Sequence, residues 1–294
     1  YIVNSTCSSL LPDDRIEYLT SYSGLQIRNR YNTGFLQSGS QSGTIENGLF
    51  TSPHPIFNLG IHGENQLISI IDTGVDYNHA FFKDPSIEYK RGILINTTMK
   101  THRKIEKYYN FANAGDGDNG HGTHCGGILA GESYLNDSGL IMYSGMAPKA
   151  RLVVGDVGFG PRDLDGEFDQ FELFNLFDSD GVSICSNSWG FDANEETRID
   201  TMIYDYIGYL HQEMLLVFAA GNEARTPPYF YTINSPGDSK NLLSVGGLSP
   251  TKMQGIENTN QWTIEINGVR YKSVYAGRGE NPLRTTKGNP MKRL

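Results

Sequence analysis

Cysteine is scarce in this sequence, and long apolar runs are absent. The 294 residues contain three cysteines, Cys7, Cys125 and Cys185, which cannot all pair with one another and whose spacings match no common zinc pattern. No window approaches the roughly 18 consecutive apolar residues of a membrane-spanning helix. These absences exclude a disulfide framework, a cysteine-rich zinc domain and a membrane span in this chain.

Lys and Arg are also fewer than Asp and Glu. The chain has 24 Lys and Arg against 33 Asp and Glu, which gives a formal net charge of -9 at pH 7. Basic residues cluster only near Arg103 and at the extreme C-terminus, whereas a nucleic-acid surface needs Lys and Arg gathered along one face. We therefore expect no nucleic-acid partner.

Glycine, by contrast, is abundant, and it is densest in a turn at residues 119–128, NGHGTHCGGI. Gly120 and Gly122 free the backbone on both sides of His121, and the residues that follow are small or apolar enough to start a buried helix. The pattern predicts that His121 lies at the N-terminus of a helix and that its side chain is not simply buried.

Two apolar segments end on polar residues. Residues 66–71, QLISII, read as a short strand that stops at Asp72. Residues 215–220, LLVFAA, read as another strand, which runs through a glycine into Asn222. Ligands and catalysis gather at the carboxyl ends of strands in open α/β sheets. Asp72, His121 and Asn222 are therefore candidates for one site.

From about residue 57 onward, short apolar strands alternate with helix-compatible stretches. This pattern favours right-handed βαβ units and a mostly parallel, doubly wound α/β sheet. Further strands are predicted at residues 151–154, 182–186 and 242–246. Apolar residues recur every three or four positions within residues 199–213, which predicts a crossover helix there.

The pattern divides the chain into three parts. Residues 1–56 form a polar N-terminal extension with a Gly/Ser/Gln-rich linker, and residues 57–249 form the α/β core. Residues 250–294 are predicted to begin a β-rich insertion, because residues 261–266 and 269–274 alternate with period two around an Asn-Gly pair. The chain starts with Tyr1 and without a signal-peptide pattern, so we expect a fragment or a processed form.

The motifs resemble those of the subtilisin-like serine peptidases, in which an apolar strand before Asp-Thr-Gly is followed by Gly-His-Gly-Thr-His and then by Ala-Ala-Gly-Asn. The resemblance covers roughly residues 57–247. It implies a subtilisin-like fold and a serine endopeptidase that hydrolyses peptide bonds in protein or peptide substrates. The family's fourth motif, Gly-Thr-Ser, is absent, so the nucleophile of the Asp-His-Ser triad is expected in the remainder of the same polypeptide.

The resemblance also implies a role for each candidate residue. Asp72 would accept a hydrogen bond from Nδ1 of His121, so that Nε2 can take a proton from the serine hydroxyl. Asn222 would donate its side-chain amide to the oxyanion hole. An extended peptide binds by adding a strand, with alternate side chains entering pockets. The pocket for the residue before the scissile bond would be lined by Ser188, Trp189, Gly190, Ala219, Ala220 and Gly221.

Other readings of the same residues are weaker. Asp-Thr-Gly after a strand is also typical of aspartic peptidases, but the second candidate carboxylate, at residues 137–139, follows a polar segment. A metal hydrolase built on His121 and His124 lacks the glutamate or further ligand of a zinc site. Cys125, four residues after His121, is interpreted as a small buried apolar residue.

The main alternative function belongs to another class, a catalytically inactive subtilisin-like fold that serves as a binding or interaction module. The missing serine motif supports it, and the retention of Asp72, His121 and Asn222 opposes it. Reading the gene beyond Leu294 for Gly-Thr-Ser would discriminate the two.

The resemblance implies less about cofactors and location. Calcium is common in the family, but no Asp-rich loop here shows the alternating oxygen ligands of a calcium site, so no cofactor is expected and structural calcium stays open. A secreted or lumenal location is expected by resemblance. Propeptide cleavage is expected somewhere between about Tyr31 and Pro55.

Overall fold

The computed structural model describes fifteen stretches of the chain, and two compact units contain them, Tyr1–Pro55 and Ile56–Leu294. The described stretches are residues 33, 36–37, 44–46, 49–51, 54–88, 98–112, 115–116, 120–135, 143–158, 164, 168–191, 198–222, 233–250, 263–266 and 269–273. In the first unit, β1 (Thr44–Glu46) pairs antiparallel with β2 (Leu49–Thr51). The three-part division of the sequence stays a prediction.

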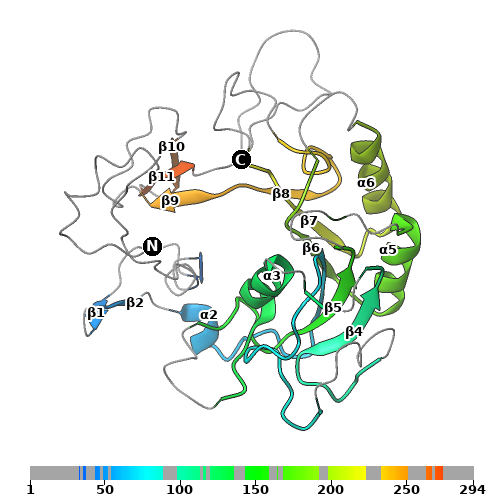
Figure 1. Cartoon of the computed structure of the whole chain (residues 1–294). Helices are drawn as coiled ribbons and strands as arrows, with labels where there is room; N and C mark the ends of the chain where they lie inside the picture. Colours follow the sequence, from blue (N-terminus) through cyan, green and yellow to red (C-terminus); the bar gives the residue numbers. More distant parts are fainter. Residues whose placement is uncertain are drawn as a thin grey trace, which may run out of the picture. The chain divides into compact units, whose positions relative to one another are not determined.

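The second unit is built around a six-stranded parallel sheet with the order β4-β5-β3-β6-β7-β8 (Figure 1). Its strands are β3 (Leu67–Asp72), β4 (Ile105–Asn110), β5 (Arg151–Asp156), β6 (Ile184–Asn187), β7 (Leu215–Ala219) and β8 (Leu243–Val245). From β3 the chain first builds β4 and β5 on one side and then β6, β7 and β8 on the other. This order is doubly wound, and it confirms the predicted α/β fold class.

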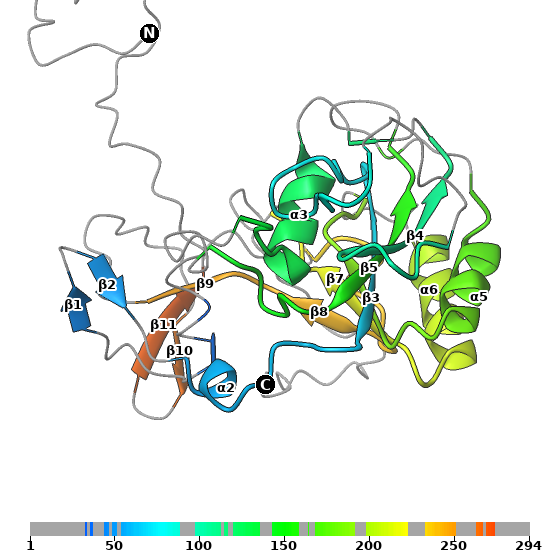
Figure 2. The ribbon, with the colours of Figure 1, turned by 90° about the horizontal axis from the view of Figure 1, so that it is seen from below.

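Helices cover both faces of this sheet. Alternate strand residues face opposite ways, so Ile70 and Val154 pack on the side of α3 (His121–Ala130), whereas Ile71 and Val153 belong to the cluster that contains side chains of the other two helices. Figure 2 shows α3 on one side of the sheet and α5 and α6 on the other. The bounds of these helices are α5 (Gln170–Ser179) and α6 (Arg198–Leu210).

Local sequence accounts for the two crossover helices. Asp169 caps α5, because its side chain accepts a hydrogen bond from the main-chain N–H of Glu172 at 3.1 Å. In α6, Tyr204 and Ile207 are fully buried against the sheet. The outer side of α6 nevertheless carries exposed Tyr206, so the apolar stripe is wider than the buried face. No helix among the residues described here has the length and apolar character needed to cross a membrane.

A second, antiparallel sheet follows the core strands. The predicted hairpin is present as β10 (Thr263–Ile266) and β11 (Val269–Ser273), with Ile266 opposite Val269. β9 (Leu248–Pro250) pairs with β11 as a third strand. A short α2 (Pro55–Asn58) precedes β3. How far a β-rich insertion extends remains a prediction, since most of residues 251–294 lie outside the described part of the chain.

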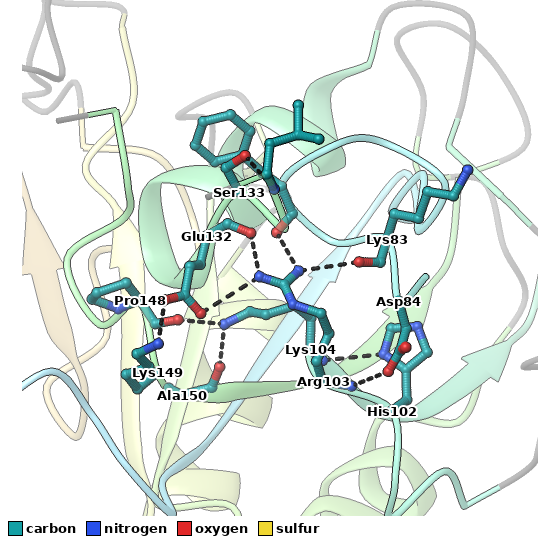
Figure 3. Close-up of polar contacts among 12 residues, drawn as sticks. Lys83, Asp84, His102, Arg103, Lys104, Glu132, Ser133, Pro148, Lys149 and Ala150 are labelled. Carbon is teal, nitrogen blue, oxygen red and sulfur yellow. Dashed lines mark hydrogen bonds and ion pairs between the residues drawn. The ribbon is translucent and has the colours of Figure 1, made fainter. Parts of the chain in front are cut away.

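A polar cluster ties the start of β4 to the segment before β5 (Figure 3). Lys104 is 1% exposed, and its ammonium donates to the carbonyls of Pro148 at 2.7 Å and Ala150 at 2.6 Å. Beside it, the Arg103 guanidinium pairs with Glu132. Burial lowers the pKa of Lys104 to about 7, because desolvation disfavours the charged ammonium.

Replacing Lys104 with methionine is expected to destabilise the chain by about 1–3 kcal/mol, because two buried carbonyls lose their donor. The folded-state pKa of about 7 lies below the usual lysine value, so the unfolded chain binds more protons above pH 7. Lys104 therefore adds stability as the pH rises from about 7 to about 10, and the gap between wild type and Lys104→Met should widen over that range.

Denaturant unfolding at several pH values measures this gap. Lys149→Met is the matched control, because Lys149 also pairs with Glu132 but its side chain is half exposed. Equal losses in the two variants, with stability curves parallel to that of the wild type, would show that the buried ammonium has no such role.

Candidate active site

Asp72 is the last residue of β3, a central strand of the parallel sheet. Its carboxylate is buried, with 1% of the residue exposed. Oδ1 accepts a hydrogen bond from the main-chain N–H of Thr73 at 2.8 Å. The strand end therefore holds a desolvated negative charge in a fixed orientation at the carboxyl edge of the sheet.

His121 is the first residue of α3, as the glycine-dense turn predicted. Gly120 before it adopts a left-handed conformation with φ of 66°, which a residue with a side chain rarely takes. Nδ1 of His121 lies 2.7 Å from Oδ1 of Asp72, within hydrogen-bond distance. The imidazole is 44% exposed, so this side chain faces solvent while its partner is buried.

The carboxylate changes the protonation of the imidazole. The hydrogen bond that His121 donates to Asp72 raises the pKa of His121 well above the ordinary 6.5, and the contact with the Cys125 thiol contributes in the same direction. A hydrogen bond to a carboxylate favours the charged form of histidine, because the imidazolium offers a stronger donor. Asp72 also makes Nδ1 the protonated nitrogen of the neutral ring, and Nε2 is then the basic one.

Close contact between two turns brings this pair together. Gly74 has φ of +94°, and a Cβ added at Gly122 would lie 1.9 Å from the Gly74 carbonyl oxygen. Thr73 joins the same two turns, since its Oγ1 accepts from the N–H of Gly122 at 2.9 Å. Only glycine at position 122 lets the first turn of α3 approach the end of β3 this closely.

Asp116 reinforces this junction, and sequence analysis missed it. Its Oδ1 accepts from the Thr73 hydroxyl at 2.7 Å, and its Oδ2 accepts from the N–H of Thr123 at 2.8 Å. Because no side chain caps α3 at Gly120, Asp116 satisfies one of the free N–H groups of the first turn. An aspartate five residues before His121 was the available signal, but its partners are set by the fold.

Cys125 was interpreted as a small buried residue, but it is only partly buried: it packs against the core, and its sulfur also faces the imidazole. Sγ lies 3.8 Å from Nδ1 and 3.9 Å from Nε2 of His121. Ligand atoms of Asp72, His121 and Cys125 lie within 4.8 Å of one another. This donor set does not fit calcium, which takes oxygen ligands, and His124 has no place in it.

The other predicted site residues follow β6 and β7, at the same edge of the sheet. β6 pairs in parallel with both β3 and β7, with Asn187 opposite Ile71 and Phe218. The stretches that continue these two strands therefore begin next to each other at this edge. Ser188, Trp189 and Gly190 follow β6, and Ala220, Gly221 and exposed Asn222 follow Ala219, the predicted pocket residue that ends β7.

Trp189 is anchored to the core as well as placed at this edge. Its indole N–H donates to the carbonyl of Ile71 at 3.0 Å, next to Asp72. The ring packs edge-on against Phe218, with 5.2 Å between ring centroids, and against Tyr204. The indole thus fixes the end of β3, which gives Trp189 a structural role in addition to the predicted pocket role.

A further segment, residues 233–239, contacts both stretches and was not predicted. Asn234 donates its N–H to the Ala220 carbonyl at 3.2 Å, and the Ser235 carbonyl accepts from Phe191 N–H at 2.7 Å. A Cβ added at Gly190 would lie 2.9 Å from that same Ser235 oxygen. The close backbone approach explains why residue 190 is a glycine.

Comparison with known proteins gives one family. The family model described as the subtilase family matches residues 63–292 of the chain. The serine protease AprX of Bacillus subtilis is 30% identical over 194 residues, which cover 63% of this chain and 39% of AprX. The serine protease/ABC transporter B family protein tagB of Dictyostelium discoideum is 26% identical over 238 residues, 78% of this chain and 11% of tagB.

Among solved structures, the crystal structure of fervidolysin from Fervidobacterium pennivorans, a keratinolytic enzyme related to subtilisin, shares 15% identity with a TM-score of 0.47. The alignment covers 77% of this chain and 29% of that one. The chain spans well under two thirds of the length of these relatives, between 11% and 39% of the two curated ones named above.

Gly122→Ala is expected to destabilise the chain by about 1–3 kcal/mol, since the new Cβ forces the Gly74 carbonyl aside and no flexible side chain can yield. Gly127→Ala in the same helix is the matched control. A Cβ there meets nothing within 4 Å, and alanine favours helix over glycine by up to about 1 kcal/mol. Chemical unfolding measures both variants, and a Gly122→Ala chain as stable as Gly127→Ala would contradict the close approach.

Proposed function

Because the chain belongs to the subtilase family of serine peptidases, we propose that it carries the aspartate, histidine and oxyanion donor of a serine endopeptidase acting on protein or peptide substrates. The observation that carries the proposal is the 2.7 Å contact between buried Asp72 and Nδ1 of half-exposed His121 at the carboxyl edge of the sheet. A buried acceptor behind a solvent-facing imidazole is the arrangement that general-base catalysis needs.

In the proposed mechanism, Asp72 holds the imidazole so that Nε2 faces the substrate. Nε2 takes the proton of a serine hydroxyl as its oxygen attacks the peptide carbonyl, and it returns that proton to the leaving amine. The imidazolium that forms between these steps is stabilised by the adjacent carboxylate. Since only the neutral ring can accept the first proton, activity is expected to fall as the pH drops through the ionisation of His121, and the raised pKa of His121 shifts this fall toward alkaline pH.

The nucleophile is proposed to come from another segment of the same polypeptide, since no Gly-Thr-Ser motif occurs in these 294 residues. Exposed apolar residues on one face of the sheet, within the described part of the chain, support this. α3 packs on β3 and β5, whereas Ile184, Leu215 and Leu243, on β6 to β8, are 40–48% exposed. Parallel sheets are normally covered on both faces, so an apolar helix beside α3 would complete the sheet there.

Two further assignments complete the proposal. Asn222 would donate its side-chain amide to the oxyanion of the tetrahedral intermediate. An extended peptide would pair with the stretches after β6 and β7, with the side chain before the scissile bond seated between Ser188–Gly190 and Ala219–Gly221. The adjacency of β6 and β7 supports these walls. A secreted or lumenal location is part of the proposal on family grounds.

The alternative of an inactive binding module rests on the missing serine motif alone. Against it, the chain keeps the buried carboxylate of Asp72 in hydrogen-bond contact with His121. A binding module has no use for a buried carboxylate, whose desolvation costs free energy.

A fluorophosphonate probe tests the proposal, because it labels only a serine that a neighbouring base activates. The full-length protein is expected to be labelled at a serine outside residues 1–294, and His121→Ala should abolish the labelling. The 294-residue chain alone should not react, because it lacks the nucleophile. Binding and oxyanion contacts then leave at most a residual acceleration of about 10³–10⁴-fold.

Two outcomes would overturn the proposal. Labelling of the short chain at one of its own serines, lost on His121→Ala, would mean that the nucleophile is misplaced. An unlabelled full-length protein that carries intact Asp72 and His121 would favour the binding module. Cys125→Ala is the control variant. It removes a side chain that contacts the imidazole but leaves His121, the proton acceptor, in place.

A further inference from the structure

We propose that Tyr108 and Asp156 form a buried positioning pair that holds the turn after Asp72 in the geometry required for the Asp72–His121 contact. The inference rests on the proposed function, because it assigns to this pair the task of orienting the catalytic dyad. Neither residue touches the substrate in this account, so both act through the groups they bind.

Asp156 lies beside Asp72 on the neighbouring strand. It is the last residue of β5, and the parallel register places it directly opposite Asp72. Its side chain is fully buried, and Oδ2 accepts hydrogen bonds from the Tyr108 hydroxyl at 3.0 Å and the N–H of Gly115 at 3.3 Å. A second buried carboxylate therefore stands next to that of the dyad.

Tyr108 links this carboxylate to the turn. It lies on β4, which β5 separates from β3, so its hydroxyl reaches past one strand to the end of another. The hydroxyl oxygen accepts the main-chain N–H of Val75 at 3.2 Å. A Cβ added at Gly74 would lie 2.6 Å from this oxygen, which shows how tightly the turn rests on it.

Two routes lead from the pair to the imidazole. The first runs from Tyr108 through the Gly74 turn to Gly122, the neighbour of His121. The second runs from Asp156 through Gly115 to Asp116. The Asp116 carboxylate binds the Thr73 hydroxyl and the N–H of Thr123. Loss of the pair would thus loosen both sides of the junction between β3 and α3.

The chemistry of the pair argues for a role beyond packing. Burial raises the pKa of Asp156 to about 6, so its ionised form is destabilised by the fold. Burial also raises the pKa of Tyr108, so the phenol keeps its proton and stays a donor to the carboxylate. Apolar side chains of similar volume would fill this space without the desolvation free energy that the carboxylate costs. Costly buried charges beside a reactive pair are typical of functional sites.

Tyr108→Phe tests the proposal in this chain without any catalytic assay. The variant leaves the N–H of Val75 without its acceptor and Asp156 without its donor. We expect the Nδ1 proton resonance of His121 to weaken or move, and the imidazole titration to fall toward 6.5 by about one pH unit, a tenfold change in proton affinity. His121→Ala assigns the resonance.

Tyr204→Phe is the matched control, because Tyr204 is equally buried but packs in the cluster on the other face of the sheet. It should leave the His121 signals unchanged. A Tyr108→Phe chain that folds, by circular dichroism, and titrates like Tyr204→Phe would overturn the proposal.

Asp156 gives an independent pair of variants in case Tyr108→Phe does not fold. Asp156→Asn keeps an oxygen that can accept from the Tyr108 hydroxyl, so it should preserve the Nδ1 proton resonance, whereas Asp156→Leu should lose it. Equal behaviour of the two would refute a positioning role for the carboxylate.

In the full-length protein, Tyr108→Phe is expected to lower kcat roughly tenfold or more with KM nearly unchanged, because small misplacements of catalytic groups slow chemistry more than binding. A change confined to KM would also refute positioning. If the full-length protein has no peptidase activity at all, the proposed function fails. The His121 resonance and titration still test whether Tyr108 and Asp156 position the imidazole.

Discussion

The geometry of the candidate site depends on one steric constraint, the approach of the first turn of α3 to the Gly74 carbonyl. A Cβ at position 122 would lie 1.9 Å from that oxygen, so the backbone itself, and not a side chain, sets how near the helix comes to the strand end. That approach brings Nδ1 of His121 to 2.7 Å from the carboxylate of Asp72. Thr73 and Asp116 then bind both turns, and the raised pKa of His121 follows from the resulting contact.

Asp72 and His121 could be placed from the sequence because short motifs carry backbone requirements. An apolar strand that stops at an aspartate and a histidine between two glycines each specify a local conformation, and the doubly wound order brings them together. Asp116 and Asp156 carry no such local signal. Their roles come from partners far along the chain, as in the hydrogen bond of Asp156 to Tyr108, which is 48 positions away. Residues 233–239 were missed for the same reason.

Within the parallel sheet and the helices that cover it, β4 and α5 were not predicted from the sequence, for physical reasons. β4 has an irregularity between Ile105 and Lys107, which breaks the period of two by which a strand is recognised. α5 carries phenylalanines on both its buried and exposed sides, so its helical period is blurred. Trp189 illustrates a different limit. The resemblance placed it in a pocket wall, and the structure adds a hydrogen bond to Ile71 that holds the end of β3.

We expect the contact with Asp72 to control the protonation of His121. Titration of the His121 imidazole by nuclear magnetic resonance, in wild type and Asp72→Asn, measures this effect. Asparagine keeps the size of the side chain and removes the negative charge. We expect a midpoint above 6.5 in the wild type that falls toward 6.5 in Asp72→Asn, because the imidazolium loses its charged acceptor. The same midpoint in both proteins would contradict it.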